Sequence, residues 1–511
     1  MAISLIRGKY VVVRADLDGQ SRLLSDAAVA QQDGVILEVG PYSTLRDRYP
    51  EATAIGNGRQ FLLPGLVNAH HHGRGVSSLQ TGQPDGPLET WIHRGMGRRP
   101  IDTYLMARYT VMQYLRSGTT TVMFNQSAVS ADRVSDDAQA NLKAFQEVGV
   151  RVAFSAAYRN QCFLVYGDDD AFLASLPAEL ATELRTAIDQ QIMPADDYLA
   201  LCGSLERSYP ASESASVRIL LSPQNYQWCD EQTLQRIAEF ARGHGLGVHT
   251  HLVETLYQRL YAEKLHGQTP AQRLHQIGFL GPEVSLAHGV WLTRDDIALL
   301  AAAGTSVCHN PSSNLRLHSG IAPVLAMLGQ GVPVALGTDS TGINDDDDMF
   351  QEMGLALRLH RPPGLEEQTI SAHQVLHMAT LGGARATAFG DTIGALEPGR
   401  HADMVLVDWD RVSSPYLDPD ADPIEALVSR ARVRDVETVI ADGVVVYEGG
   451  LFPGRDHDAV VREVQEQLSG PAPEAVRRRR QAYRELEPHL RRFYADWNLE
   501  ATALYRYHSI H

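Results

Sequence analysis

The chain has 511 residues, of which 44% are hydrophobic and 21% charged; this is ordinary for a globular protein of roughly two to four domains. Its formal net charge of −17 would repel nucleic acid and anionic membranes, so we expect neither as a partner. No apolar run approaches the roughly 18 residues of a membrane span. The sequence shows no signal peptide either.

The four cysteines lie far apart and form no CxxC pair. This spacing argues against a disulfide scaffold and against a zinc site built from thiolates. Together with the missing signal peptide, it predicts a cytoplasmic protein.

Short β-rich segments fill residues 3–60, and similar segments return late as ADMVLVDWD, VETVIADG and GVVVYEGG. Both groups are rich in β-branched residues and are interrupted by Gly and Asp. We predict that the two distant ends pair into one small sheet domain beside a central domain.

The middle of the chain alternates short apolar strands with segments of helical period. The eight strands are GLVNAH, GTTTVMFN, GVRVAFSAAY, SVRILLSP, LGVHTHL, VSLAHG, TSVCHN and PVALGTD. Such alternation predicts a parallel (β/α)8 TIM barrel, an α/β fold, over residues 62–391. A doubly wound sheet is the competing fold, but it favours a Gly-rich phosphate turn after the first strand, and none follows GLVNAH.

Two further segments are predicted to be helical. Residues 159–215 form a long third crossover, which we interpret as an insertion near the barrel mouth and either a lid or an oligomer contact. Residues 452–511 form a C-terminal extension, which we expect to pack on its own or a neighbouring subunit.

Several histidines fall where the predicted strands end, which is the end of a barrel that carries its chemistry. His70 and His72 end the first strand, and His249 and His251 end the fifth, with Glu254 just beyond. His288 ends the sixth strand and Asp339 the eighth. Alone, His288 is better explained as a hydrogen-bonded core residue, but several such groups at one barrel end are a less probable accident.

Residues i and i+2 of a strand share a face, so His70 and His72 point together while His71 points aside. Two such imidazoles, one from the fifth strand and the carboxylate of the eighth suit Zn²⁺ or Fe²⁺, and Mn²⁺ is also tolerated. His249 and His251 share a face, so periodicity leaves both open as the third ligand. The fourth strand has no lysine to carry a bridging carboxylate, which favours one metal over two.

Seven ordered motifs resemble the amidohydrolase superfamily, in its branch of chlorotriazine hydrolases and guanine, 8-oxoguanine and cytosine deaminases. They are LPGLVNAHHH, SGTTTV, HTHLVET, LAHGVWL, CHNPSSNLRLHSGIAP, LGTDSTGINDDDDMF and ATLGGARATAFGDTIGALEPGRHADMVLVD. The resemblance implies a composite β-sandwich from residues 1–61 and 392–451 beside the barrel. It also implies a homo-oligomer, either a dimer or a tetramer.

Position by position, the resemblance implies that His70, His72, His251 and Asp339 bind the metal. It implies catalytic roles for Glu254, His288 and Asp339. In the expected reaction Asp339 accepts a proton from the water, Glu254 protonates the ring nitrogen and His288 stabilises the adduct.

Four residues are candidates for substrate contact. Trp91 lies in a PLxxW-like element, and Gln224 stands where several relatives have histidine. His249 becomes a neighbour of the metal site that faces either the substrate or the ligands. Asn314 either binds substrate or holds its own loop by side-chain to backbone bonds.

Three functions compete. The first is an amidohydrolase that deaminates an amino-substituted purine, pterin or pyrimidine and releases ammonia. The second uses the same site on another carbon–nitrogen or carbon–chlorine bond, in an amide, urea, carbamate or chlorotriazine. The third is an inactive, metal-free scaffold, which has no physical need for the ligand set. In the first two the partner is a small-molecule substrate.

Overall fold

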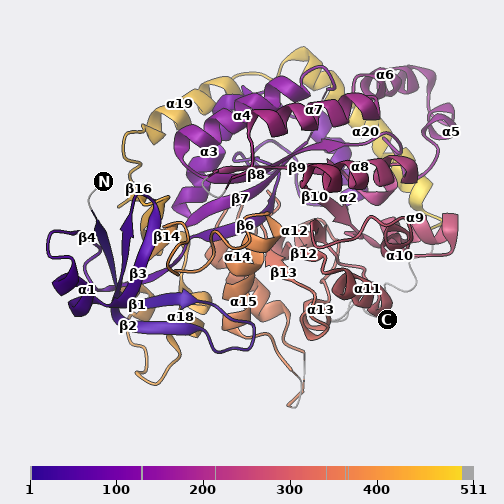
Figure 1. Cartoon of the computed structure of the whole chain (residues 1–511). Helices are drawn as coiled ribbons and strands as arrows, with labels where there is room; N and C mark the ends of the chain where they lie inside the picture. The colour runs from indigo at the N-terminus through magenta and orange to yellow at the C-terminus, as the bar shows by residue number, and fades with distance from the viewer. Residues whose placement is uncertain are drawn as a thin grey trace.

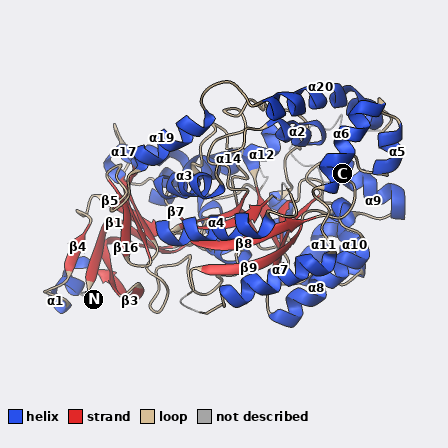
Figure 2. Ribbon diagram, turned by 90° about the horizontal axis from the view of Figure 1, so that it is seen from above, coloured by secondary structure: helices blue, strands red, loops and turns tan. Residues whose placement is uncertain are grey.

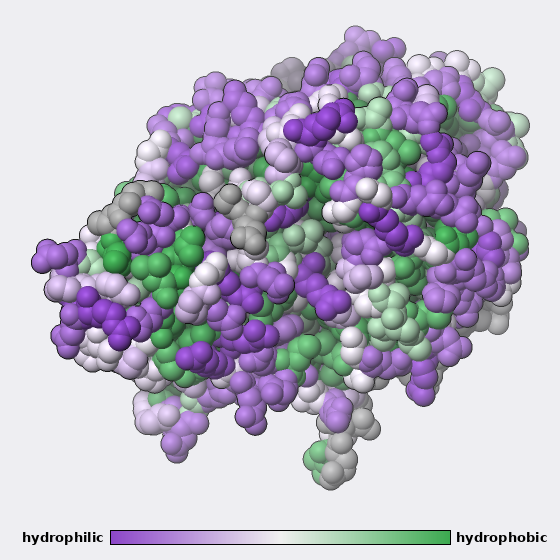
Figure 3. Space-filling view, viewed as in Figure 1, coloured by the Kyte–Doolittle hydropathy of each residue, from purple (hydrophilic) through white to green (hydrophobic). Residues whose placement is uncertain are grey.

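The computed structural model describes residues 3–127, 130–212, 215–340, 342–362, 364–365 and 368–497. Figure 1 shows a central barrel, a sheet that lies to one side of it, and C-terminal helices that run along the barrel from near that sheet toward the opposite end. In the described part of the chain, no helix is both long and apolar enough to cross a membrane. Hydrophilic side chains cover most of the face in Figure 3, with apolar ones in separate patches.

Eight parallel strands form the barrel and follow one another in chain order. They are β6 (Leu66–His71), β7 (Thr119–Gln126), β8 (Arg151–Tyr158), β9 (Val217–Pro223), β10 (Gly247–Leu252), β11 (Val284–His288), β12 (Ser306–His309) and β13 (Val334–Leu336). Just past β13, the backbone N–H of Asp339 donates to the carbonyl of His70 at 3.0 Å, which nearly closes the sheet. The predicted (β/α)8 barrel is confirmed, with all eight predicted strands in place.

Helices cover the outside of the barrel (Figure 2). They are α3 (Thr103–Arg116), α4 (Val134–Val148), α8 (Glu231–His244), α9 (Leu256–His266), α10 (Pro270–Gln276), α11 (Arg294–Ala303), α13 (Val324–Gly329), α14 (Met349–Leu359), α15 (Ala372–Met378) and α16 (Leu381–Ala386). Two more helices, α2 (Leu88–Arg94) and α12 (Pro311–Arg316), lie at the C-terminal end of the barrel. α8 shows why they form: Asp230 caps its first turn by accepting the N–H of Thr233, and Gly245 ends it at φ 66°. Its apolar stripe, which includes Leu234 and Ile237, is buried against the barrel.

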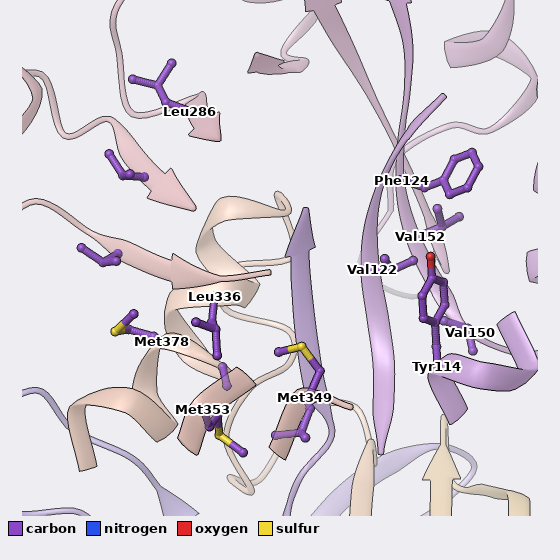
Figure 4. Packing of buried hydrophobic residues seen from close by; sticks show 14 of the residues in the cluster. Tyr114, Val122, Phe124, Val150, Val152, Leu286, Leu336, Met349, Met353 and Met378 are labelled. Atoms are coloured by element: carbon purple, nitrogen blue, oxygen red, sulfur yellow. The ribbon is translucent and has the colours of Figure 1, made fainter. Parts of the chain in front are cut away.

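The main core lies between the strands and these helices. Figure 4 shows Tyr114 of α3 beside Val122 and Val152, and Leu336 of β13 near Met353 of α14. Each of these side chains is almost fully removed from water. Burial of one such apolar side chain contributes about 1.5 to 3 kcal/mol, so this layer holds the strand ends in fixed positions.

The two β-rich ends of the chain form one mostly antiparallel sheet, which confirms the predicted composite domain. Its strands are β1 (Ser4–Arg14), β2 (Arg22–Gln32), β3 (Val35–Pro41), β4 (Thr53–Ile55), β5 (Gln60–Pro64), β14 (Met404–Asp408), β15 (Val436–Ala441) and β16 (Val444–Glu448), with helices α1 (Tyr42–Arg48), α17 (Trp409–Ser413) and α18 (Pro423–Arg430). N-terminal β5 pairs with C-terminal β14, where Leu62 lies opposite Leu406. Buried Arg151 joins this sheet to the barrel through Asp403 at 2.8 Å. The predicted domain boundaries themselves stay a prediction.

The long crossover and the C-terminal extension are helical where described. They contain α5 (Asp169–Ala174), α6 (Ala178–Asp189), α7 (Ala195–Ser208), α19 (His457–Leu468) and α20 (Glu474–Tyr494). α5, α6 and α20 gather at the end of the barrel away from the composite sheet (Figures 1 and 2). Leu184 of α6 and Leu490 of α20 belong to one buried apolar cluster. The predicted extension beyond residue 497 lies outside the described residues.

Candidate active site

Polar side chains from four separate strands converge at one point at the C-terminal end of the barrel. One ligand atom from each of His70, His251, His288 and Asp339 can be chosen so that all lie within 4.8 Å of one another. His72 joins them, because its Nε2 lies 3.2 Å from Asp339 Oδ1 and 3.2 Å from His251 Nε2. The structure thus brings together all four predicted metal ligands and His288.

Backbone carbonyls orient two of these rings. His72 donates from Nδ1 to the carbonyl of Asn125 at 2.9 Å, and His251 donates from Nδ1 to the carbonyl of Gln224 at 2.7 Å. With Nδ1 occupied, Nε2 of each ring faces the cluster. Such outer contacts fix the tautomer and orientation of metal-binding histidines.

His249 lies behind His70. Its Nε2 is 2.8 Å from His70 Nδ1, and its Nδ1 is 2.7 Å from Ser285 Oγ. Both nitrogens are therefore engaged, and the fully buried ring has none left for a substrate. The expectation that His249 contacts substrate does not fit this arrangement.

The chemistry of the cluster fits one divalent metal ion, as predicted. Burial lowers the pKa of His70 to about 3 and brings the pKa of His251 well below its usual value. Both rings are therefore neutral at pH 7, as metal ligation requires. Nε2 of His288 is buried without a hydrogen-bond partner among the described residues, and Nε2 of His70 forms no hydrogen bond there either, although Asp339 Oδ1 lies 3.0 Å from it. Such orphaned nitrogens are unfavourable unless a ligand satisfies them.

His71 turns away from the cluster, as the strand alternation predicted. Its Nε2 lies 2.9 Å from Asp347 Oδ1, and its Nδ1 is hydrogen-bonded to the hydroxyl of Tyr114. The ring is fully buried between these partners. His71 thus connects β6, the first strand of the barrel, to α3 and to the loop after β13.

Glu254 and His288 face each other beside the cluster. Glu254 Oε2 lies 3.7 Å from His288 Nε2, which is 3.9 Å from Asp339 Oδ2. Burial, with the nearby charges of Asp339 and Glu89, raises the pKa of Glu254 well above its usual value. Asn314 Oδ1 lies 2.9 Å from His288 Nδ1, so this side chain contacts a site residue, while its amide nitrogen is buried without a hydrogen-bond partner among the described residues.

The backbone carries strain at this site. His288 has φ 76° and Asp339 φ 53°, both in the left-handed region that non-glycine residues seldom adopt. Each costs about 1 to 3 kcal/mol and persists only where surrounding contacts impose it. For Asp339 one such contact is Ser313, whose hydroxyl donates to Oδ2 at 2.6 Å.

A cavity of about 230 Å³ opens beside the cluster and is lined by Gln224 but not by Trp91. Trp91 packs next to it with Leu88 and Leu317. The cavity also contains Arg74 and Arg98, whose importance the sequence interpretation missed. Both arginines lie in loops, where no periodic pattern in the sequence indicates which way a side chain points.

Residues 61–446 match the model of the amidohydrolase family. The chain belongs to that family. Residues 27–52 also match an imidazolonepropionase-like composite domain of bacteria, in agreement with the composite sheet.

Two curated relatives of this amidohydrolase are deaminases. A 5-methylthioadenosine/S-adenosylhomocysteine deaminase of Moorella thermoacetica is 31% identical over 87% of this chain and 95% of its own length. A 5′-deoxyadenosine deaminase of Methanothermobacter thermautotrophicus is 32% identical over 87% and 93%.

Solved structures agree. An adenosine deaminase from Xanthomonas campestris with bound zinc has a TM-score of 0.77 at 27% identity, over 91% of this chain and 98% of that chain. Atrazine chlorohydrolase from Arthrobacter aurescens, complexed with zinc, has a TM-score of 0.77 at 26% identity, over 91% and 100%. The predicted family, fold and class are confirmed: the amidohydrolase is a hydrolase of carbon–nitrogen bonds.

Proposed function

We propose that this chain is a metal-dependent hydrolytic deaminase of an amino-substituted N-heterocycle, specifically an adenine nucleoside. The observation that carries the proposal is the convergence of a neutral histidine set, Asp339 and buried Glu254 on one point. The similarity to deaminases of modified adenosines supports the adenine ring. The resident ion is proposed to be zinc, held by His70, His72, His251 and Asp339.

A bound divalent ion lowers the pKa of water from about 15.7 to about 7 and so supplies hydroxide at neutral pH. Asp339 takes the proton from the attacking water. Glu254, kept protonated by burial, donates to the ring nitrogen beside the amino-bearing carbon. His288 stabilises the oxygen of the adduct. Asp339 then passes its proton to the exocyclic nitrogen, the carbon–nitrogen bond breaks, and ammonia leaves. The remaining hydroxyl proton of the adduct returns to Glu254 as the ring carbonyl forms, so both carboxyl groups regain their starting states.

The test is a substrate panel for the zinc-loaded protein. It contains adenosine, 5′-methylthioadenosine, guanine, cytosine and atrazine, with ammonia and chloride measured separately. We expect ammonia from the adenine nucleosides. Chloride from atrazine without ammonia from any nucleoside would instead support the second function, which the similarity to atrazine chlorohydrolase favours. The predicted cytoplasmic location and homo-oligomer remain predictions beside this one.

His71 and His249 make a matched pair, because both are fully buried; His71 belongs to β6, and His249 contacts His70 of the same strand. We propose that His249 positions His70 and that His71 only supports the fold. His249→Ala should weaken metal affinity about 10- to 100-fold, as the loss of such outer partners does. His71→Ala should keep one metal per chain and lose about 1 to 3 kcal/mol of stability, because Tyr114 and Asp347 lose a partner. Competition with a chelator and thermal melting measure the two effects, and equal metal loss in both variants would contradict the assignment.

A further inference from the structure

The cavity beside the metal cluster is lined by three arginines that come from three different parts of the chain. Arg74 follows β6, Arg98 follows α2, and Arg159 follows β8. The same cavity borders the metal cluster, because two residues that line it contact proposed ligands: the carbonyl of Gln224 accepts from His251, and Ser127 Oγ lies 3.4 Å from His72 Nδ1. Arg74 is close enough to Asp339 for their charges to interact. A molecule bound at these arginines therefore lies next to the reacting groups.

None of the three guanidinium groups is paired with an acid. Across the described ranges, no carboxylate oxygen lies within 4.0 Å of them, although nearby Arg94 pairs with Glu487 at 3.4 Å. Arg98 donates from Nε to the amide oxygen of Gln83 at 2.9 Å, and Arg159 donates to that of Gln191.

The guanidinium groups of Arg74 and Arg98 also lie over the same indole ring. Each guanidinium carbon is 5.7 Å from the ring centroid of Trp91. Two like charges are thus held around one side chain and point into one cavity.

Besides Asp339, two acidic residues lie near these arginines, and both accept hydrogen bonds from other groups. Glu89 accepts hydrogen bonds from the hydroxyls of Thr255 and Tyr166, and burial raises its pKa to about 7. Asp169 accepts the backbone N–H groups of Phe163 at 2.6 Å and Leu164 at 2.8 Å. Neither carboxylate forms an ion pair with the arginines of the cavity, although the charge of Asp169 still raises the pKa of Arg159.

The positive charge of the cavity is therefore poorly compensated. Burial, with the charge of Arg74, lowers the pKa of Arg98 to about 8, and burial lowers the pKa of Arg159 to about 10. A half-buried cation without a carboxylate partner is unfavourable, whereas a charge-assisted pair with an anion is among the stronger contacts in proteins. Arginine is also the side chain best suited to a planar carboxylate or a phosphate.

We infer that the substrate carries a carboxylate or phosphate group, which Arg74, Arg98 and Arg159 bind while its amino-heterocycle reaches the metal cluster. This inference rests on the proposed function. The apolar part of the cavity wall includes Ile188 of α6 and Tyr494 of α20. The insertion and the C-terminal extension thus enclose the part of the substrate that distinguishes it from a bare base.

The kinetic test compares three substrates of the zinc-loaded protein: neutral adenosine, adenosine 5′-monophosphate and S-adenosylhomocysteine, which carries a carboxylate. The wild type should prefer one of the two anionic compounds, and the preferred one identifies the anion. Arg98→Gln and Arg159→Gln should each lower the preference for it, as a ratio of kcat/KM to adenosine, by about 10- to 100-fold. Arg484→Gln, an exposed arginine of α20, is the control. Equal kcat/KM for all three compounds, or a ratio unchanged in both variants, would overturn the inference and leave the deaminase intact.

A second measurement does not depend on turnover. Inorganic phosphate and acetate are added at matched ionic strength against chloride, and the melting temperature is recorded. Either phosphate or acetate should raise the melting temperature of the wild type and of Arg484→Gln by about 1 to 2 °C. Neither anion should raise that of the double variant Arg98→Gln/Arg159→Gln. If no nucleoside releases ammonia, the proposed function fails while this shift still tests the anion site. Arg159→Lys, which keeps the charge, replaces Arg159→Gln if that variant does not fold, and an equal shift in all variants overturns the inference.

Discussion

Glu254→Gln is expected to lower kcat by about 10² to 10⁴-fold while the protein keeps one metal ion per chain. Glu254 is buried and lies 3.7 Å from His288, so it borders the reacting groups without belonging to the proposed ligand set. Glutamine has the same shape and can donate a hydrogen bond, but it has no carboxyl proton to transfer to the ring nitrogen. The chemical step should fail while binding persists.

The matched control is Glu263→Gln on α9, where the same change removes only a half-buried ion pair with Arg259. Its kcat should remain within about twofold of wild type, because such pairs contribute little. Steady-state ammonia release and elemental analysis of the metal measure both variants. Wild-type turnover in Glu254→Gln would contradict the proposed proton transfer by Glu254. Loss of the metal ion from that variant would indicate that Glu254 is a metal ligand.

Asp339→Asn is expected to lower activity by at least about 10⁴-fold and to lower metal content as well. Asp339 is the only carboxylate among the proposed ligands, and it also accepts the proton in the proposed reaction. The amide that replaces it is a weaker ligand and no base. One substitution therefore removes two functions, which is why its effect should exceed that of Glu254→Gln.

A readout independent of turnover separates the two functions of Asp339. Zinc should raise the melting temperature of metal-free wild type, because an ion that binds only the folded chain stabilises it. It should raise that of Asp339→Asn much less. Asp410→Asn, in the composite domain, is the control and should behave as wild type. If Asp339→Asn were fully stabilised by zinc but inactive, the proton-accepting role of Asp339 would stand and its role as a metal ligand would be rejected.

The strand ends could be predicted from the sequence because the alternation of strands and helices fixes where side chains of a barrel meet. Period two also separated His71 from His70 and His72. It could not separate His249 from His251, because both share one face of β10 and differ only in depth along the strand. Which of the two histidines reaches the metal depends on contacts with the neighbouring strand β11, where the hydroxyl of Ser285 is hydrogen-bonded to Nδ1 of His249.

Contacts that use the backbone could not be predicted either. The carbonyls of Asn125 and Gln224 orient two ligands, and any residue type supplies the same carbonyl. The arginine cavity was missed for a related reason. Arg74, Arg98 and Arg159 lie in loops, whose course follows from tertiary packing and not from any periodic pattern.

The pairing of β5 with β14 has a consequence for synthesis of the chain. Leu62 is synthesised long before Leu406, its partner in the sheet. At roughly 5 to 20 residues per second the delay between them is roughly 20 to 70 s. During that time β5 is an open edge beside a finished β1, and such edges recruit other strands. A nascent chain of this protein therefore needs shielding until its last strands arrive, and a product cut before Met404 exposes the same edge permanently.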